Sequence, residues 1–239
     1  PEEVNRKVAV VVADLHFAAT ETSKANLLRE GVDPDLIHVT GNPVIDALHM
    51  VADMPYDLDS GPLADIPWGK RVILVTAHRR ENFGAPLENI CAALREIAEA
   101  YAEDVHLVYP VHLNPKVQEP VYRLLGDAPN ITLLPPLDYL PMVQLMKRAY
   151  LVLTDSGGIQ EEAPGLGKPV LVLRETTERP EAVDAGTVRI VDTDRADIVA
   201  LTRRLLDDST LYGIMARAVN PYGDGHAAAR IAEPLRRVA

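Results

Sequence analysis

The sequence is poor in cysteine, in positive charge and in long apolar runs. Its single cysteine, Cys91, excludes an internal disulfide and any metal centre built on several cysteines. Lys and Arg number 24 against 35 for Asp and Glu, and the net charge of -11 argues against nonspecific binding to nucleic acid or to an anionic membrane surface. The apolar runs have the length of strands, so we expect no transmembrane span. We therefore expect a protein of the reducing cytoplasm.

What is present is enough apolar sequence for a sizeable core. Hydrophobic residues make up 47% of 239 residues, which suits one large domain or two small ones. Cys91 lies at an apolar position of a helical pattern, so we expect it to be buried. The sequence begins at Pro1 with no signal peptide, inside a charged helical pattern, and we expect that the start of a larger protein is missing.

Short apolar segments alternate with amphipathic helical patterns along most of the chain. The helical patterns include residues 86–103 and 140–149. The apolar segments are continuous rather than alternating, which is typical of strands in a parallel sheet covered on both faces. This order predicts an α/β protein with a Rossmann-like, doubly wound parallel sheet. The predicted strands are residues 71–77, 105–111, 131–135, 150–155, 169–174 and 187–192.

The first part of the chain repeats this rhythm on a smaller scale. Residues 15–20 and 37–41 read as short strands around a helix over 21–31, capped by Thr20 or Glu21 and ended by Gly31. Two strands do not form a stable sheet alone, so this part indicates a second α/β domain.

These patterns divide the chain into three parts. We predict the C-terminal end of an N-terminal Rossmann-like domain over residues 1–41, a C-terminal Rossmann-like domain over 42–222, and a terminal helix over 223–239 that packs towards the N-terminal domain. Residues 54–70 are rich in Pro, Gly and Asp and read as an exposed loop.

The segment "TDSGGIQEE" joins a predicted strand directly to a helix. Ligands bind at the carboxyl ends of parallel strands, and Gly157 and Gly158 allow a ligand to approach the backbone. The helix N-terminus and the Ser156 hydroxyl suit a phosphate, and Glu162 can accept hydrogen bonds from a ribose. Taken alone, the segment reads equally as a tight turn with a capping serine and a solvated acidic helix face.

Two further strand ends bring basic residues to the same edge. "AHRRENFG" carries His78, which can transfer a proton or hold a phosphate, or can be an ordinary loop histidine. "RETTERPE" carries Arg174 and Arg179, and Arg179 can clamp a pyrophosphate or pair on the surface with Glu178 or Glu181. Three strand ends converging on one edge favour a ligand site over three unrelated features.

Several longer motifs extend this pattern over essentially the whole chain. They are "PEEVNR", "HFAATETSKANLLREG", "VTGNPVIDAL", "TAHRRENFG", "YPVHLNP", "TDSGGIQEEAPGLGKPVLVLRETTERPEAV" and "NPYGDGHAAARI". Together they resemble the bacterial, non-hydrolysing UDP-N-acetylglucosamine 2-epimerases. The resemblance implies the GT-B arrangement of two Rossmann-like domains, of which only the end of the first is present here. It also implies a homodimer that needs no cofactor and no metal.

The resemblance assigns a UDP site to residues of this sequence. It implies that the phosphates are held by the serine and glycines of "DSGG", the ribose by the second glutamate of "QEE", and the pyrophosphate by the arginine of "TERPE". Contacts on the uracil side fall in "PLDYLPM", where a leucine stands at a position that glutamine can occupy in relatives. These residues are Ser156, Gly157, Gly158, Glu162, Arg179, Leu137 and Met142.

The resemblance also implies the chemistry, an elimination of UDP from C1 with loss of the C2 proton, followed by readdition. Its catalytic candidates are His78 and Glu2, and a second nucleotide-sugar site falls on Arg79 and His112. The reaction interconverts UDP-N-acetylglucosamine and UDP-N-acetylmannosamine, a precursor step for polysaccharides. The family places a phosphate-binding loop and two acidic catalytic residues ahead of "PEE", so we expect this chain alone to bind UDP without epimerising its sugar.

Three other functions stay open at this point. A hydrolysing 2-epimerase would share the fold and release free N-acetylmannosamine. A retaining glycosyltransferase would share a glutamate near the ribose, but no acceptor site is evident. A non-catalytic nucleotide-sugar binding module would bind UDP without turnover.

Overall fold

The computed structural model describes residues 1–238, which form two compact units. One unit contains Pro1–Met50 together with the segment from Pro221, and the other contains Val51–Asn220. The first change of unit falls within the helix α3 (Pro43–Ala52). The assignment of residues 1–41, 42–222 and 223–239 to named domains stays a prediction.

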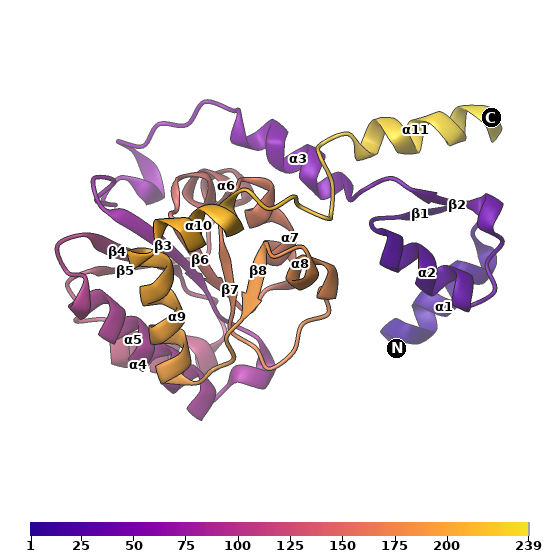
Figure 1. The fold of residues 1–239 in the computed structure, drawn as a ribbon. Helices are drawn as coiled ribbons and strands as arrows, with labels where there is room; N and C mark the ends of the chain where they lie inside the picture. The colour runs from indigo at the N-terminus through magenta and orange to yellow at the C-terminus, as the bar shows by residue number, and fades with distance from the viewer. Residues whose placement is uncertain (239) are drawn as a thin grey trace. The chain divides into compact units, whose positions relative to one another are not determined.

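The larger unit is built on a six-stranded sheet in which every pairing is parallel (Figure 1). The strand order is β5-β4-β3-β6-β7-β8. The chain therefore starts in the middle, proceeds to one edge, crosses back and proceeds to the other edge, as in the doubly wound fold predicted from the sequence. The strands are β3 (Arg71–Thr76), β4 (Val105–Pro110), β5 (Ile131–Leu134), β6 (Leu151–Thr154), β7 (Val170–Val172) and β8 (Val188–Ile190).

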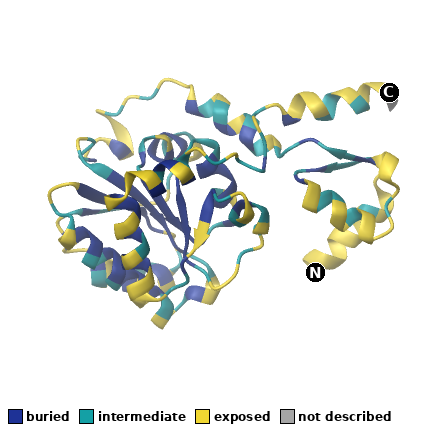
Figure 2. Cartoon of the chain, in the orientation of Figure 1, coloured by how far each residue is buried: buried dark blue, intermediate teal, exposed yellow. Residues whose placement is uncertain are grey.

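Helices cover both faces of this sheet, which explains why its strands are continuously apolar. α4 (Ala85–Ala100), α5 (Pro115–Leu125) and α9 (Arg195–Asp207) enclose the main core with one face of the strands. The central strands β3, β4, β6 and β7 are almost wholly buried, whereas β8 at the edge is partly exposed and the helices expose their outer sides (Figure 2). Cys91 is fully buried on α4 as expected, and burial raises the pKa of its thiol to about 12. The remaining helices of this unit are α6 (Tyr139–Arg148), α7 (Gly157–Gly165), α8 (Pro180–Asp184) and α10 (Ser209–Ala216).

Residues 54–70 are not the wholly exposed loop that their composition suggested. The segment contains a 3-10 turn at Gly61–Leu63, and the side chains of Leu63 and Ile66 are buried. Proline and glycine mark turns correctly here, but two apolar side chains in the segment still pack into the core because burial stabilises them by about 1.5–3 kcal/mol each.

The smaller unit contains a two-stranded parallel sheet of β1 (His16–Ala18) and β2 (Ile37–Val39). Between them lie α2 (Glu21–Arg29) and a 3-10 turn at Pro34–Leu36. Thr20 caps α2 by accepting a 3.0 Å hydrogen bond from the Ser23 N–H, and Gly31 follows the helix with φ of +87°. Both features confirm the sequence prediction.

The C-terminal segment packs onto α3 within this unit. α11 (Ala227–Val238) begins at a cap supplied from α3, since the Asp46 carboxylate accepts the N–H groups of Ala227 and Ala228, each at 3.0 Å. Asn42 also donates its N–H to the Tyr222 carbonyl at 2.7 Å. The first helix, α1 (Glu2–Val12), has no buried residue.

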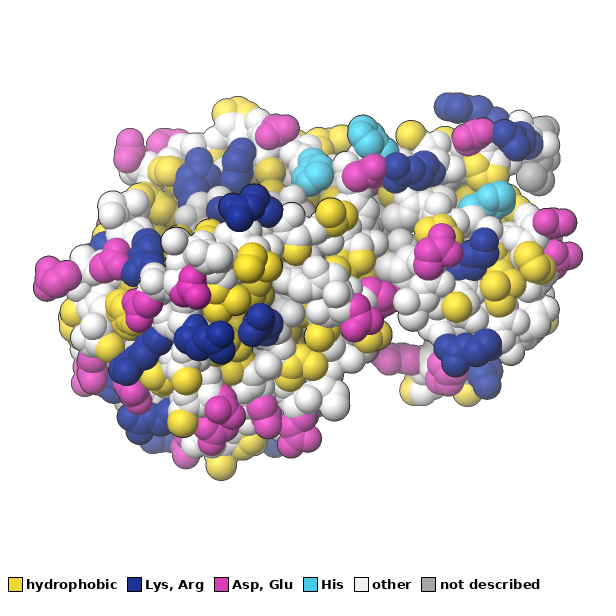
Figure 3. Space-filling model, viewed as in Figure 1, with side chains coloured by type: hydrophobic (Ala, Val, Ile, Leu, Met, Phe, Trp, Pro, Cys, Tyr) yellow, Lys and Arg dark blue, Asp and Glu magenta, His cyan; other side chains and the backbone are white. Residues whose placement is uncertain are grey.

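The surface in Figure 3 carries interspersed acidic and basic side chains rather than one extended basic patch. Within residues 1–238, no helix combines the length and apolar character needed to cross a membrane.

Candidate functional site: the edge where strands β3, β6 and β7 end

The candidate site lies where the two central strands of the larger sheet end. β3 leads into His78 and Arg79, and its neighbour β6 leads into Asp155 and Ser156. These two strands lie where the strand order reverses, so their following loops diverge to opposite faces and leave a crevice at the carboxyl edge. The sequence-predicted convergence of strand ends is therefore present in the fold.

Asp155 organises this edge. Its carboxylate is fully buried, and Oδ2 accepts three hydrogen bonds, from the N–H groups of His78 and Arg79 at 2.7 Å each and from Nδ2 of Asn82 at 3.1 Å. Because a buried carboxylate must be compensated by donors, these bonds fix the loop after β3 to the end of β6.

Asp155 also faces the imidazole of His78. The distance from Asp155 Oδ1 to His78 Nδ1 is 3.4 Å, and Oδ1 makes no other side-chain hydrogen bond. Burial lowers the pKa of His78 below 6.5, while Asp155 acts against this shift and His112 and Arg79 act with it. The lowered pKa favours the neutral imidazole of His78, and a proton on Nδ1 pointing to Asp155 would leave Nε2 able to accept a proton.

His112, after β4, stacks on His78. Their ring centroids are 5.3 Å apart and the planes differ by 10°. The Asn114 N–H donates to His112 Nδ1 at 3.1 Å, which orients the ring. The structure thus brings together His78, Arg79 and His112, as the proposed second nucleotide-sugar site requires, without testing that role.

α7 begins directly after β6, and no side-chain hydrogen bond caps its N-terminus, although the Glu178 carboxylate lies beside Gly157. Ser156 occupies the N-cap position of α7, as the sequence-based alternative had it, but its side chain makes no capping hydrogen bond. Neither Gly157 nor Gly158 has a positive φ, so backbone conformation does not require glycine at either position. A Cβ at Gly158 would stand 3.6 Å from Glu162 Oε1 and 4.0 Å from Ser156 Oγ, so the face of this glycine is open. An open glycine face beside helix N–H groups suits an anion.

The two glutamates of α7 are buried and do not form the solvated face considered from the sequence. Glu161 is 6% exposed and Glu162 is 9% exposed. Tyr139, at the start of α6, donates its hydroxyl to Glu162 Oε2 at 2.8 Å, which leaves Oε1 beside Gly158. Burial raises the pKa of Glu162, with Tyr139 acting against the shift and Glu161 with it. A carboxylate in this setting can accept a hydrogen bond from a ligand hydroxyl.

Three arginines surround the same helix N-terminus, and each is bound to a carboxylate. Arg79 bonds Glu178 at 3.0 Å, and Arg174 bonds Glu81 at 2.6 Å and also Glu178. Arg179 bonds the buried Glu161 on α7 at 2.5 Å. A Cβ at Gly157 would lie 3.5 Å from Arg79 Nη2 and 3.7 Å from Arg179 Nη2. The guanidiniums therefore reach the place where the phosphates are expected.

The two residues expected on the uracil side lie next to this cluster. Leu137 is half-buried on the loop before α6, and Met142 is half-buried in the first turn of α6. The Tyr139–Glu162 hydrogen bond joins their segment to α7. Leu137 also lines a cavity of about 500 Å³ with Tyr56 and several prolines.

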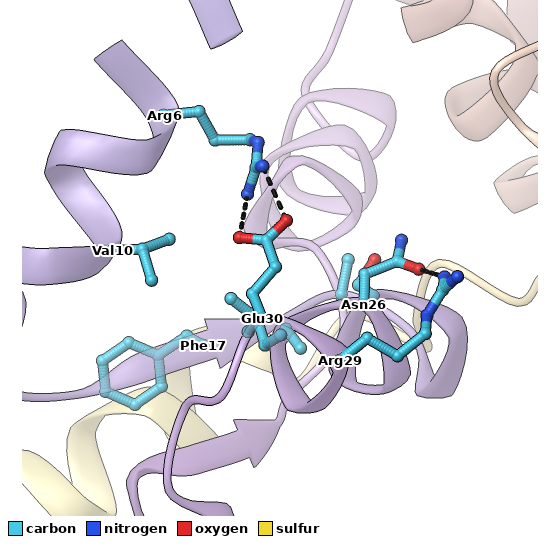
Figure 4. A pocket seen from close by; sticks show the side chains of 10 residues that line it. Arg6, Val10, Phe17, Asn26, Arg29 and Glu30 are labelled. Atoms are coloured by element: carbon cyan, nitrogen blue, oxygen red, sulfur yellow. Dashed lines mark hydrogen bonds and ion pairs between the residues drawn. The ribbon is translucent and has the colours of Figure 1, made fainter. Parts of the chain in front are cut away.

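The remaining catalytic candidate, Glu2, lies in the smaller unit. It occupies the first turn of α1 and is exposed. The smaller unit has a cavity of about 650 Å³ between α1, α2 and β1 (Figure 4). Its charged side chains bond one another: Arg6 Nη2 donates to Glu30 and Glu3 at 2.7 Å each, and Arg29 bonds Asn26. The strand-end cluster is the stronger candidate for a ligand site, because it lies at the carboxyl edge of the larger sheet beside a helix N-terminus.

Several residues of the cluster were not identified from the sequence. Asp155 follows an apolar strand within "TDSGG", and a carboxylate at the end of a buried strand was the available signal. Asn82, Tyr139, Glu161 and Glu178 left no comparable signal, because their partners lie far along the chain.

A doubly wound α/β unit with cationic groups, an uncapped helix N-terminus and a buried carboxylate at its switch point has the architecture of a nucleotide-binding domain. The family is shown by direct comparison. The chain belongs to the UDP-N-acetylglucosamine 2-epimerase family, whose model matches residues 1–236.

Individual relatives agree. The chain is 56% identical to the UDP-N-acetylglucosamine 2-epimerase of Escherichia coli K12 over 99% of its own length and 64% of that protein's. The UDP-GlcNAc 2-epimerase of Neisseria meningitidis, solved bound to UDP-GlcNAc, is 45% identical with a TM-score of 0.88, covering 99% of this chain and 65% of that one. The S. aureus MnaA–UDP co-structure is 46% identical with a TM-score of 0.91, covering 100% and 64%. The chain thus spans slightly less than two thirds of these relatives.

Proposed function

We propose that this chain belongs to an isomerase that reversibly epimerises C2 of UDP-N-acetylglucosamine to give UDP-N-acetylmannosamine, and that its larger unit binds the UDP part. The observation that carries the proposal is the convergence of an uncapped helix N-terminus, the guanidiniums of Arg79 and Arg179, and the buried Glu162 at one switch point. Relatives of the same family, with UDP or UDP-GlcNAc in their solved structures, support the choice of ligand.

The proposed binding mode follows from the chemistry of each group. The phosphates lie at Ser156, Gly157 and Gly158, where N–H groups and the helix dipole stabilise negative charge. Arg179 contributes its planar guanidinium to the pyrophosphate. Glu162 accepts a ribose hydroxyl on the oxygen that Tyr139 leaves available. The uracil lies towards Leu137 and Met142.

The proposed reaction is elimination and readdition of UDP. The C2 proton leaves as the C1–oxygen bond to UDP breaks, which gives a glycal, and a proton then returns to C2 on the other face as UDP adds back. Negative charge grows on the departing pyrophosphate, so preorganised N–H and guanidinium donors lower the barrier. The proposed catalytic residues are His78, whose imidazole lies 3.4 Å from Asp155 and can transfer a proton, and Glu2.

The wider setting is part of the proposal. We propose a homodimer in the cytoplasm that supplies a precursor of polysaccharide synthesis, with Arg79 and His112 serving a second nucleotide sugar.

Two assays test the proposed function. Calorimetry with UDP on the 239-residue chain tests binding. Turnover is tested on a protein with the full length of the relatives, incubated with UDP-N-acetylglucosamine in deuterium oxide. Epimerisation should give UDP-N-acetylmannosamine with deuterium at C2. Release of free N-acetylmannosamine would show the hydrolysing reaction instead, and binding without deuterium uptake would show a non-catalytic module.

Replacing Glu162 with alanine should weaken UDP binding by roughly 1–3 kcal/mol, because the ribose hydroxyl loses a buried, charged acceptor. The matched probe is 2′-deoxy-UDP. It should bind the natural chain more weakly than UDP does, and the two ligands should bind Glu162→Ala about equally. An undiminished preference for UDP in Glu162→Ala would remove this residue from ribose recognition.

Replacing Arg179 with alanine should weaken binding of UDP more than binding of uridine, because its guanidinium serves the pyrophosphate. The alanine variant also breaks the contact with Glu161, whose side chain is 8% exposed, so Arg179→Lys is the companion variant. Lysine keeps the charge near Glu161 but lacks the planar fork. Equal losses for UDP and uridine in both variants, measured by calorimetry, would contradict the phosphate role.

A further inference from the structure

Glu178 places a carboxylate where the proposed phosphate site begins. It lies on the loop between β7 and α8, and its Oε1 is 2.8 Å from the position that a Gly157 Cβ would occupy. The same oxygen accepts a 3.0 Å hydrogen bond from Arg79 Nη2, and Oε2 accepts one from Arg174. The side chain therefore bridges two guanidiniums directly against the first residue of α7.

This contact is poorly explained as a stabilising ion pair. The side chain of Glu178 is 40% exposed, and pairs in contact with water contribute little to folding. The carboxylate is nonetheless charged. Partial burial acts to raise the pKa of Glu178. A hydrogen bond from the residue's own backbone N–H to the carboxylate and the bond from Arg174 outweigh this effect and hold the pKa below 4.5. An anion thus lies at a helix N-terminus where an anion is stabilised.

A bound phosphate would need the same donors. The Arg79 guanidinium already bonds the Glu178 carboxylate, which lies beside Gly157 at the start of α7, and two anions so close would repel strongly. We propose that Glu178 is an internal competitor that occupies the anion site of the unliganded chain and must swing away when the diphosphate of the ligand binds. This inference rests on the proposed UDP site.

Displacement of Glu178 has a consequence for selectivity. When its carboxylate leaves, Arg79 and Arg174 lose one internal partner each and can bond phosphate oxygens instead. A ligand without phosphates, such as uridine, does not require the displacement. A phosphate-bearing ligand can bind only those molecules in which Glu178 has left the site. Glu178 therefore reduces the apparent affinity for such a ligand in proportion to the fraction of molecules with a vacant site, and it leaves the affinity for a nucleoside unchanged.

The test is Glu178→Gln in the 239-residue chain, with Glu175→Gln as the matched control. Both variants remove one negative charge from the same exposed loop, but only Glu178 touches Gly157. The probes are UDP, inorganic pyrophosphate and uridine, and calorimetry measures the affinity for each of them. Glu178→Gln should bind UDP and pyrophosphate about threefold to tenfold more tightly, since half-exposed ion pairs are individually weak. Uridine affinity should not change, and Glu175→Gln should bind all three as the natural chain does.

A loss of affinity for phosphate-bearing ligands in Glu178→Gln, in place of the expected gain, would overturn the inference. If Glu178→Gln binds pyrophosphate more weakly or equally, Glu178 positions the arginines or is irrelevant to them, and it is not a competitor. An equal gain in Glu175→Gln would also overturn it, because the effect would then be general charge. Either of these outcomes would leave the proposed UDP site itself intact, provided that the natural chain binds UDP and that Gly158→Val loses this binding. If neither the natural chain nor Glu178→Gln binds UDP, the proposed site and the competitor both fall.

Discussion

Replacing Gly158 with valine should abolish UDP binding and leave the fold intact. The added Cβ would meet only Glu162 Oε1 at 3.6 Å and Ser156 Oγ at 4.0 Å, which are ordinary contact distances. Its two methyl groups would project in front of the α7 N-terminus, where the phosphates are proposed to approach the backbone. Calorimetry should detect no UDP binding to a variant whose circular dichroism matches that of the natural chain.

The matched control is Gly69→Val, because a Cβ at Gly69 meets nothing within 4 Å and this glycine lies on the exposed turn before β3. It should bind UDP normally. Gly158→Ala should give an intermediate loss, since one methyl group obstructs less of the helix end. Undiminished UDP affinity in folded Gly158→Val would place the phosphate site elsewhere.

In a protein with the full length of the relatives, His78→Ala should lower turnover about 100-fold, the scale of a positioned acid or base. UDP affinity should fall far less than turnover. The pH profile carries more information. The neutral imidazole is the active form, so turnover should decline as the pH falls through a pKa below 6.5. Glu2→Gln should lower turnover by a similar factor, because Glu2 is the second proposed catalytic residue.

The variant Asp155→Asn tests whether Asp155 acts on turnover through the imidazole of His78. The Asp155 carboxylate raises the pKa of His78 against the effect of burial, so removing its charge should move the acidic decline of turnover to lower pH. A decline that does not move, or a His78→Ala variant that turns over normally, would contradict the assignment. The fold of Asp155→Asn must be checked by circular dichroism, because the buried Asp155 carboxylate accepts three hydrogen bonds from the loop after β3.

The strands and the edge where they end follow from local sequence. Every predicted strand of the larger unit was confirmed within a few residues, because a strand covered on both faces must be apolar throughout, and this pattern is legible in a single segment. Thr20 and Gly31 bound α2 for equally local reasons. The one failure of this kind, residues 54–70, came from reading turn residues as exposure while Leu63 and Ile66 pack inward.

The partners within the site were decided only by the tertiary structure. Asp155 meets the N–H of His78 across 77 positions, and Arg79 meets Glu178 across 99. No local pattern specifies such pairs, because each depends on how strand order and loop direction place distant segments at one edge. For the same reason the sequence left open whether Glu161 and Glu162 form a solvated helix face, whereas the tertiary structure buries both and gives each a partner. Residue types and their order thus specified the sheet and the candidates, while the fold chose which charges face one another.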